Sequence, residues 1–124
     1  MANAVNWFEI PAKDFGRAKK FYETIFGFEL MVADPERPSG MFPADWQKGE
    51  IGGSITAGEG CEPSDKGSVV FLNGGDDLAK VLDKVEGAGG KVVLPKTKIP
   101  MGDAGFMALF LDCEGNKVGL HSMG

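Results

Sequence analysis

The feature that most constrains the fold of this 124-residue chain is an internal repeat. In the first half, Asp14 precedes apolar residues at three- and four-residue spacing, and Gly27 follows the last of them. In the second half, Asp77 precedes a similar run that ends at Gly89-Gly90. Apolar residues at this spacing share one helical face, and a glycine after the last turn commonly ends a helix. The sequence therefore predicts two equivalent helices, half a chain length apart.

Strand-like runs flank both predicted helices in the same order. The predicted strands are residues 5–10, 28–32, 40–42 and 51–57 in the first half, and 69–72, 91–94, 106–111 and 117–121 in the second. Each half therefore has the order βαβββ, and turn sequences rich in Gly, Pro and Asp separate its strands. We predict an α+β fold with module one at about 1–57, a linker at about 58–67 and module two at about 68–124, all within one domain.

The predicted modules leave one sheet face uncovered. A single helix can cover only one face of a four-stranded sheet. The opposite face must be covered by the other module, by a partner chain or by a ligand.

Charge and composition exclude several classes of partner. The formal net charge is −5 and the basic residues are scattered, whereas nucleic-acid binding needs a concentrated basic surface. No apolar stretch approaches the roughly 20 residues that cross a bilayer, so we expect no membrane partner and a cytoplasmic location. Cys61 and Cys113 lie in separate turn segments without a metal-binding motif, and we predict free thiols, with a disulfide as the alternative.

Four segments carry a resemblance to a known family across essentially the whole chain. They are Trp7 to Pro11, Asp14 to Gly27, Ala88 to Gly90, and Asp112 to Asn116. In this order and spacing they resemble the vicinal oxygen chelate superfamily of glyoxalases, bleomycin-resistance proteins and dioxygenases, in particular small bacterial glyoxalase-related proteins. The resemblance implies an open, barrel-like sheet around a cavity, helices on the outside, a small-molecule ligand in the cavity, and a homodimer.

The resemblance also implies where a metal would bind. Metal-dependent members place His, Gln or Glu on the first and last strands of each module. The matching positions here are Trp7, Thr56, Val69 and Gly119, and none of these residues is a good ligand for a divalent metal. We therefore predict no metal ligands and no cofactor.

Strand alternation predicts which side chains face the cavity. The predicted cavity face comprises Trp7, Glu9, Ser54, Thr56, Val69, Phe71, Gly119 and His121. The opposite face comprises Phe8, Ile10, Val70, Leu72, Val118 and Leu120, an entirely apolar set suited to packing under the helices. From the first set we predict a ligand-binding group of Trp7, Glu9, Thr56, Phe71 and His121.

Glu9 and His121 are the candidate catalytic residues. Glu9 acts as an acid, a base or a ligand anchor, or else it bonds a backbone amide, an Arg or a Lys. His121, the only histidine, pairs with Glu9 or with a substrate, or is structural. Trp7 and Phe71, together with Phe110 or Trp46, form either an aromatic wall for a planar ligand or part of the core. Residues 34–50 form either a flap over the cavity or a dimer contact.

Three functions are compatible with these features. The leading hypothesis is a metal-free small-molecule-binding protein. The first alternative is a glyoxalase-related lyase or isomerase that uses Glu9 and His121, with or without a metal. The second is an interaction module whose cavity is filled by its own side chains.

Overall fold

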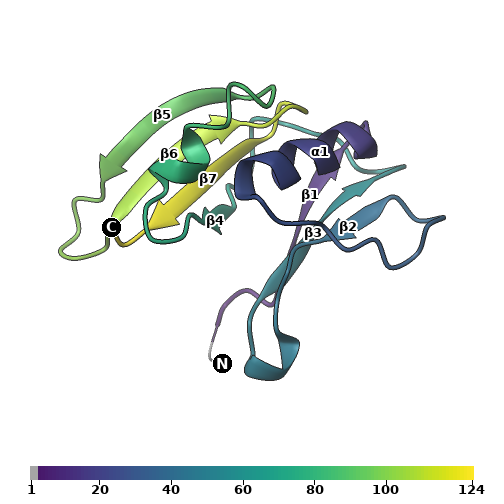
Figure 1. The fold of residues 1–124 in the computed structure, drawn as a ribbon, viewed down its shortest axis with the longest axis horizontal. Coiled ribbons are helices and arrows are strands. Elements are labelled where there is room, and N and C mark those ends of the chain that lie inside the picture. Colours follow the sequence, from purple (N-terminus) through teal and green to yellow (C-terminus); the bar gives the residue numbers. More distant parts are fainter. Residues whose placement is uncertain (1–2) are drawn as a thin grey trace.

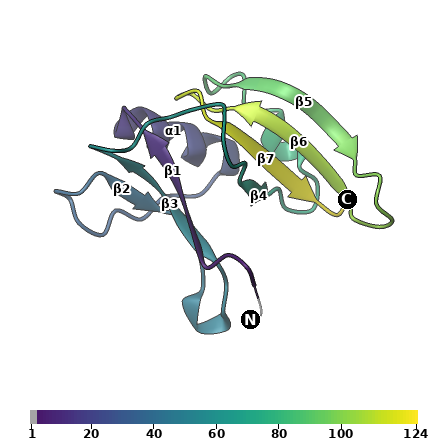
Figure 2. The same cartoon turned by 180° about the vertical axis from the view of Figure 1, so that it is seen from behind.

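The computed structural model describes residues 3–124, which form two β-sheets with two α-helices packed against them and one 3-10 helix, Trp46–Lys48 (Figure 1). The N-terminal sheet has the strand order β1 (Trp7–Ala12), β3 (Gly52–Ala57), β2 (Ser39–Met41). The C-terminal sheet has the order β4 (Phe71–Asn73), β7 (Lys117–Ser122), β6 (Phe106–Leu111), β5 (Lys91–Lys98). Figure 2 shows the segment between β3 and β4 crossing from one sheet to the other. The predicted α+β class is confirmed.

Both sheets are built on the same plan. The first strand of each module runs parallel to its last strand, β1 beside β3 and β4 beside β7, and the remaining pairs are antiparallel. A parallel pair needs a crossover connection, and in each module the helix lies in that crossover. The repeat seen in the sequence is therefore a repeat of structure.

Helix α1 (Phe15–Phe26) has the predicted ends. The Asp14 carboxylate accepts a hydrogen bond from the backbone N–H of Arg17 at 3.1 Å, which satisfies one of the free donors of the first turn. Gly27 ends the helix with φ 75°, a conformation that strains residues with a side chain. None of the helices in residues 3–124 is long and apolar enough to cross a membrane.

The second helix is shorter than predicted. Helix α2 spans only Ala79–Leu82, and Leu78, not Asp77, is its N-cap. The Asp77 carboxylate accepts instead from Lys96 Nζ on β5 at 2.8 Å and from the backbone N–H of Ala79 at 2.9 Å. After Leu82 the chain continues in turns toward Gly89, because glycine is a poor helix former and three of them lie at 87–90.

The strand predicted at 28–32 is reduced to a single bridge between Met31 and Met41. The backbone N–H of Leu30 donates to the Glu23 carboxylate of α1 at 2.8 Å, so it is not available to a strand partner. The N-terminal sheet therefore has three strands. In module two, β4 begins two residues later than predicted, and β5 extends four residues further.

The core lies between the sheets and the helices, on the predicted strand face. Ile10, Leu72, Val118 and Leu120 are all at most 6% exposed, and they pack with the apolar face of α1. Phe8 and Val70 pack partly buried against the same cluster. Strand alternation thus places the side chains between these residues on the opposite, open face of each sheet.

The turn from Asp112 to Asn116, between β6 and β7, binds module two to module one. Buried Asp112 accepts from the Tyr22 hydroxyl on α1 at 2.7 Å, and burial is the main cause that raises the pKa of Tyr22 well above its usual value. Asn116 donates to the carbonyl of Pro11 at 2.8 Å and accepts from the backbone N–H of Ser64 at 3.0 Å. We call residues 112–116 the clasp.

Glu114 is the charged member of the clasp, and its side chain is only 1% exposed. It accepts from the backbone N–H groups of Lys13 and Asp14, the latter at 2.8 Å, and from Arg17 Nε at 2.6 Å. Burial alone would raise the pKa of this carboxyl. The hydrogen bonds from Asp14, Arg17 and Lys13 outweigh burial and lower it.

Both cysteines are free, as predicted. Cys113 lies within the clasp, where burial, with Asp112 and Glu114 nearby, raises the pKa of its thiol to about 11. Little of the reactive thiolate is present at neutral pH, so Cys113 is a packing residue.

Replacing Glu114 by Ala is expected to lower the free energy of unfolding by about 2 kcal/mol, because two backbone N–H groups and Arg17 lose their acceptor. Urea denaturation at pH 7 measures this loss. The control is Glu62→Ala, since Glu62 makes only an exposed 3.9 Å ion pair with Lys13 and should change stability by less than about 0.5 kcal/mol. Equal effects of the two variants would contradict the structural role of Glu114.

The contribution of Glu114 should also appear in how the free energy of unfolding depends on pH. The pKa of Glu114 is lower in the folded state than in the unfolded state, so its contribution is complete above the unfolded value of about 4.5. That contribution is lost as the pH falls through the folded value. The Glu114→Ala variant should therefore show a flatter loss of stability below about pH 4.5 than the unmodified protein.

Candidate functional site

The open face of the N-terminal sheet carries a hollow of about 260 Å³. Its floor is formed by side chains that alternate with the core residues: Trp7 and Glu9 from β1, Ser39 and Met41 from β2, and Ser54 from β3. Its rim is the loop before β2, which contributes Asp34 and Arg37. Two carboxylates, a guanidinium and two hydroxyls therefore border one depression.

Glu9 is held by an aromatic neighbour. Its Oε2 accepts a hydrogen bond from Trp7 Nε1 at 3.2 Å, instead of the backbone amide, Arg or Lys expected as a structural partner. Trp7 also stacks on Trp46, with ring centroids 5.6 Å apart and planes 26° apart. Trp7 and Trp46 are 39% and 53% exposed, so they form an aromatic wall at the surface and are not core residues.

Three hydroxyl groups lie in a row beside Glu9. The Ser54 hydroxyl is 2.8 Å from that of Thr56, which is in turn 3.1 Å from that of Ser39. Ser54 is only 1% exposed, yet it lies opposite Glu9 in the strand register. Thr56 thus contributes to the hollow through Ser39 and Ser54 and does not line it directly.

The open face of the C-terminal sheet repeats part of this arrangement. Phe71 lies opposite Gly119 in register, and its ring lies over this glycine so closely that any added Cβ would clash with it. Asn73 lies opposite His121. Phe71, Asn73, His121 and Asp76 border a second, larger depression of about 630 Å³. Phe71 is 48% exposed, so it also is a surface residue.

The predicted ligand-binding residues fall into two groups. Trp7, Glu9 and Thr56 lie on the N-terminal sheet, and Phe71 and His121 lie on the C-terminal sheet. His121 Nε2 is 2.7 Å from the carbonyl oxygen of Ala104, so this nitrogen carries the proton and donates it. The structure does not form the predicted pair between Glu9 and His121, since each residue is hydrogen-bonded elsewhere.

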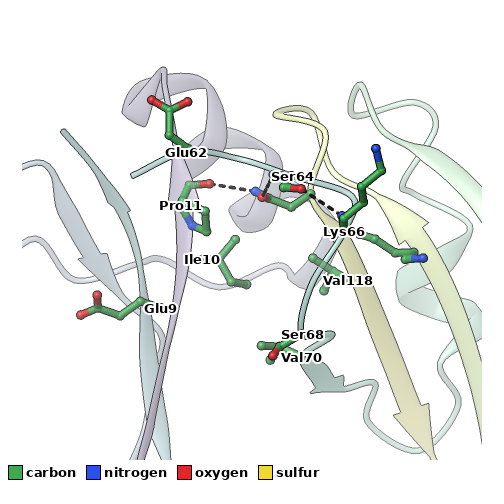
Figure 3. Close-up of a pocket in the computed structure, with 11 residues that line it drawn as sticks. Glu9, Ile10, Pro11, Glu62, Ser64, Lys66, Ser68, Val70 and Val118 are labelled. Atoms are coloured by element: carbon green, nitrogen blue, oxygen red, sulfur yellow. Dashed lines mark hydrogen bonds between the residues drawn. The ribbon is translucent and has the colours of Figure 1, made fainter. Parts of the chain in front are cut away.

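A third, smaller crevice of about 140 Å³ lies between β1 and β7 (Figure 3). Ile10, Val70 and Val118 face it, whereas the Glu9 side chain points away (Figure 3). The crossing segment closes its upper side through Ser64, which is fixed to the clasp. Glu9 borders this crevice with its backbone side, whereas its carboxylate is directed to the hollow on the open face.

The positions that match metal ligands in the related family do not fit a divalent metal. Trp7 uses its only N–H to bond Glu9, Gly119 has no side chain and lies under the Phe71 ring, and Val69 lies before β4 begins. The Thr56 hydroxyl is a weak ligand and is bonded to Ser39 and Ser54. Across residues 3–124, no three His, Cys, Asp or Glu side chains gather as a metal site would require.

Sequence analysis missed several residues that border the hollows. Asp34 and Arg37 lie in an irregular loop, and a loop has no periodicity from which a facing direction follows. Ser39 was excluded because β2 was predicted to start one residue later. Asn73 offered a usable signal, since it follows Phe71 by two residues and so shares its strand face.

Comparison with known proteins identifies the family. A sequence profile described as the Glyoxalase/Bleomycin resistance protein/Dioxygenase superfamily matches residues 4–120. The chain belongs to this superfamily, as its sequence segments indicated.

Individual relatives agree with this assignment. A protein named "Putative glyoxylase CFP32" from Mycobacterium tuberculosis is 32% identical over 120 residues, which cover 93% of this chain but 44% of that protein. This chain thus spans about half the length of its curated relatives.

Solved structures show the same fold. A glyoxalase/bleomycin resistance protein/dioxygenase family enzyme from Burkholderia phytofirmans has a TM-score of 0.72 at 16% identity, covering 96% of this chain and 98% of that one. A glyoxalase I mutant from Zea mays has a TM-score of 0.68 at 26% identity, covering 94% of this chain and 45% of that one.

The Trp7–Trp46 stack depends on the glycine beneath it, which suggests a direct test. A Cβ at Gly52 would collide with the Trp46 ring, so Gly52→Ala should expel Trp46 from the stack. The chain has only two tryptophans, and their stacking should produce an exciton couplet in circular dichroism that this variant loses. Gly87→Ala, where the added Cβ meets only one atom at 3.9 Å, should keep the couplet. A couplet retained in Gly52→Ala would contradict the close packing of Trp46 on Gly52, and its absence from the unmodified protein would disprove the stack.

Proposed function

We propose that this protein binds a small organic molecule, without a metal, in the hollow on the open face of its N-terminal sheet. The observation that carries the proposal is the convergence of Glu9, Arg37 and the Ser39 and Ser54 side chains around about 260 Å³ beside an exposed tryptophan. Ligand sites typically combine a concave apolar surface with a few converging polar groups. This hollow has both.

The polar groups define the kind of molecule that would fit. Only Oε2 of Glu9 accepts a hydrogen bond from the described residues, which leaves Oε1 to accept one from a hydroxyl or a cationic group of a ligand. Arg37 borders the same hollow and offers donors suited to a carbonyl or carboxylate. Trp7 adds a flat apolar surface. A compact molecule that carries a donor, an acceptor and an apolar face would satisfy all three.

A thermal-shift screen of small metabolites, run with and without EDTA, tests this proposal. We expect at least one compound to raise the melting temperature equally in both conditions, because ligand binding stabilises the folded state and needs no metal here. Glu9→Gln should weaken binding of that compound about tenfold, whereas Glu29→Gln, an exposed change outside the hollow, should leave it unchanged. A shift abolished by EDTA would contradict metal-free binding.

The alternative function is catalysis by a lyase or isomerase that uses Glu9, with His121 as a second candidate. Two observations favour it: a relative is named a putative glyoxylase, and Glu9 has a free oxygen in a hollow of ligand size. Catalysis would show as conversion of a bound compound that Glu9→Gln abolishes while binding is retained. A protein that only binds has no turnover to lose.

We further infer that the protein works as a homodimer. The chain exposes 7648 Å², whereas a compact monomer of 13.2 kDa is expected to expose about 6,400 Å². The excess of about 1,200 Å² is enough for one side of a standard interface. Relatives about twice this length also support a homodimer, since one such protein has room for two units the size of this chain.

Light scattering after size exclusion should give a mass close to twice 13.2 kDa. Phe71→Glu should shift the protein toward the monomer, because it places a charge on the most exposed aromatic residue of the C-terminal sheet's open face. Met101→Glu, at a residue 73% exposed in the loop between β5 and β6, is the control and should remain dimeric. A monomeric mass for the unmodified protein would refute the dimer.

A further inference from the structure

A separate apolar pocket lies on the other side of β1 from Glu9. Its volume is about 150 Å³, and its walls come from four phenylalanines, Phe8, Phe26, Phe28 and Phe42, together with Leu72 and Ile51. Phe8 and Glu9 are adjacent on a strand and so point to opposite faces. This pocket and the hollow proposed above therefore share no wall.

Local backbone geometry places the rings around this pocket. The positive φ of Gly27 reverses the chain between Phe26 and Phe28, so that their rings stack with centroids 5.1 Å apart and planes 6° apart. Gly53 lies opposite Phe8 in register and has no side chain, which allows the Phe8 ring to lie flat against the sheet. Gly27 and Gly53 thus allow the phenylalanine rings to form the walls of the pocket.

Phe42 joins these walls. Its ring lies 5.3 Å from that of Phe8 and 5.8 Å from that of Phe28, the latter at an interplanar angle of 83°. Phe42 itself is only 8% exposed, whereas Phe8, Phe26 and Phe28 are partly exposed. Rings at these angles present both edges and faces to the space between them, which is the arrangement that a further aromatic ring prefers.

We propose that this pocket binds an uncharged molecule with a single aromatic ring. An engineered apolar cavity of about 150 Å³ is known to accept benzene, so the volume suits one six-membered ring. The apolar walls would not compensate the desolvation of a charged group, so an ionised ligand is disfavoured.

Asn73 also borders the pocket. Its side chain shares the open strand face with Phe71, opposite to that of Leu72, and its Oδ1 accepts from the backbone N–H of Gly75 at 2.9 Å.

Fluorobenzene is a suitable probe, observed by fluorine NMR with the 124-residue chain. We expect saturable line broadening, together with intermolecular NOEs from the probe to Phe28, Phe42 and Leu72. Ile51→Trp should weaken binding at least about tenfold, because residue 51 is 39% exposed at the mouth and a larger ring there occupies the space. The matched control is Val93→Trp, at a residue 48% exposed on β5, and it should bind as the unmodified protein does.

Three outcomes would overturn the proposal: no saturable binding, NOEs only to residues of the open faces, or binding that disappears as protein concentration rises. The last would mean that a second copy of the chain closes the pocket. The NOEs decide the question in the unmodified protein even if Ile51→Trp does not fold. Glu9→Gln should leave fluorobenzene binding unchanged, which separates this result from the fate of the proposed function.

Discussion

The hydrogen bonds of the buried Glu114 carboxylate hold the two modules in their relative position. Glu114 accepts from the first turn of α1, while Asn116 bonds the end of β1 and the crossing segment. Asp112 adds the Tyr22 hydroxyl from the middle of α1. Five residues of a turn in module two thus contact the helix, the first strand and the crossing segment on which module one is built. These directional hydrogen bonds act together with the apolar core that both modules share.

This orientation explains why the molecule has open sheet faces. Both α-helices and both apolar strand faces build one core between the modules, so neither α-helix covers the opposite faces. On these faces exposed aromatic rings lie beside polar groups: Trp7 with Glu9 on one sheet, and Phe71 with Asn73 on the other. Because the helices pack on the interior side of the sheets, the open faces remain available for ligands or for another chain.

Glycine has an unusual part in shaping those surfaces. Gly52 and Gly119 lie under aromatic rings on the open faces, and Gly53 lies under Phe8 on the core face. In each case the missing side chain lets a ring lie flat against the sheet, where a strand residue would normally keep it away. The rings therefore act as walls of hollows and not as fillers. The alternative of a cavity filled by Trp7 and Phe71 is inconsistent with their exposure.

The repeat, the ends of α1, the strand faces and the family could be predicted from the sequence, because each depends on local periodicity or on short ordered segments. The prediction failed where a side chain outside the local pattern forms a hydrogen bond: Glu23 accepts from the N–H of Leu30, and Lys96 donates to the carboxylate of Asp77. Nor did the sequence reveal the separate hydrogen-bond partners of Glu9 and His121 on the two sheets. These partners depend on how the two modules pack, which involves the shared core and the contacts of Glu114 and Asn116, about 100 residues from their partners in β1 and α1.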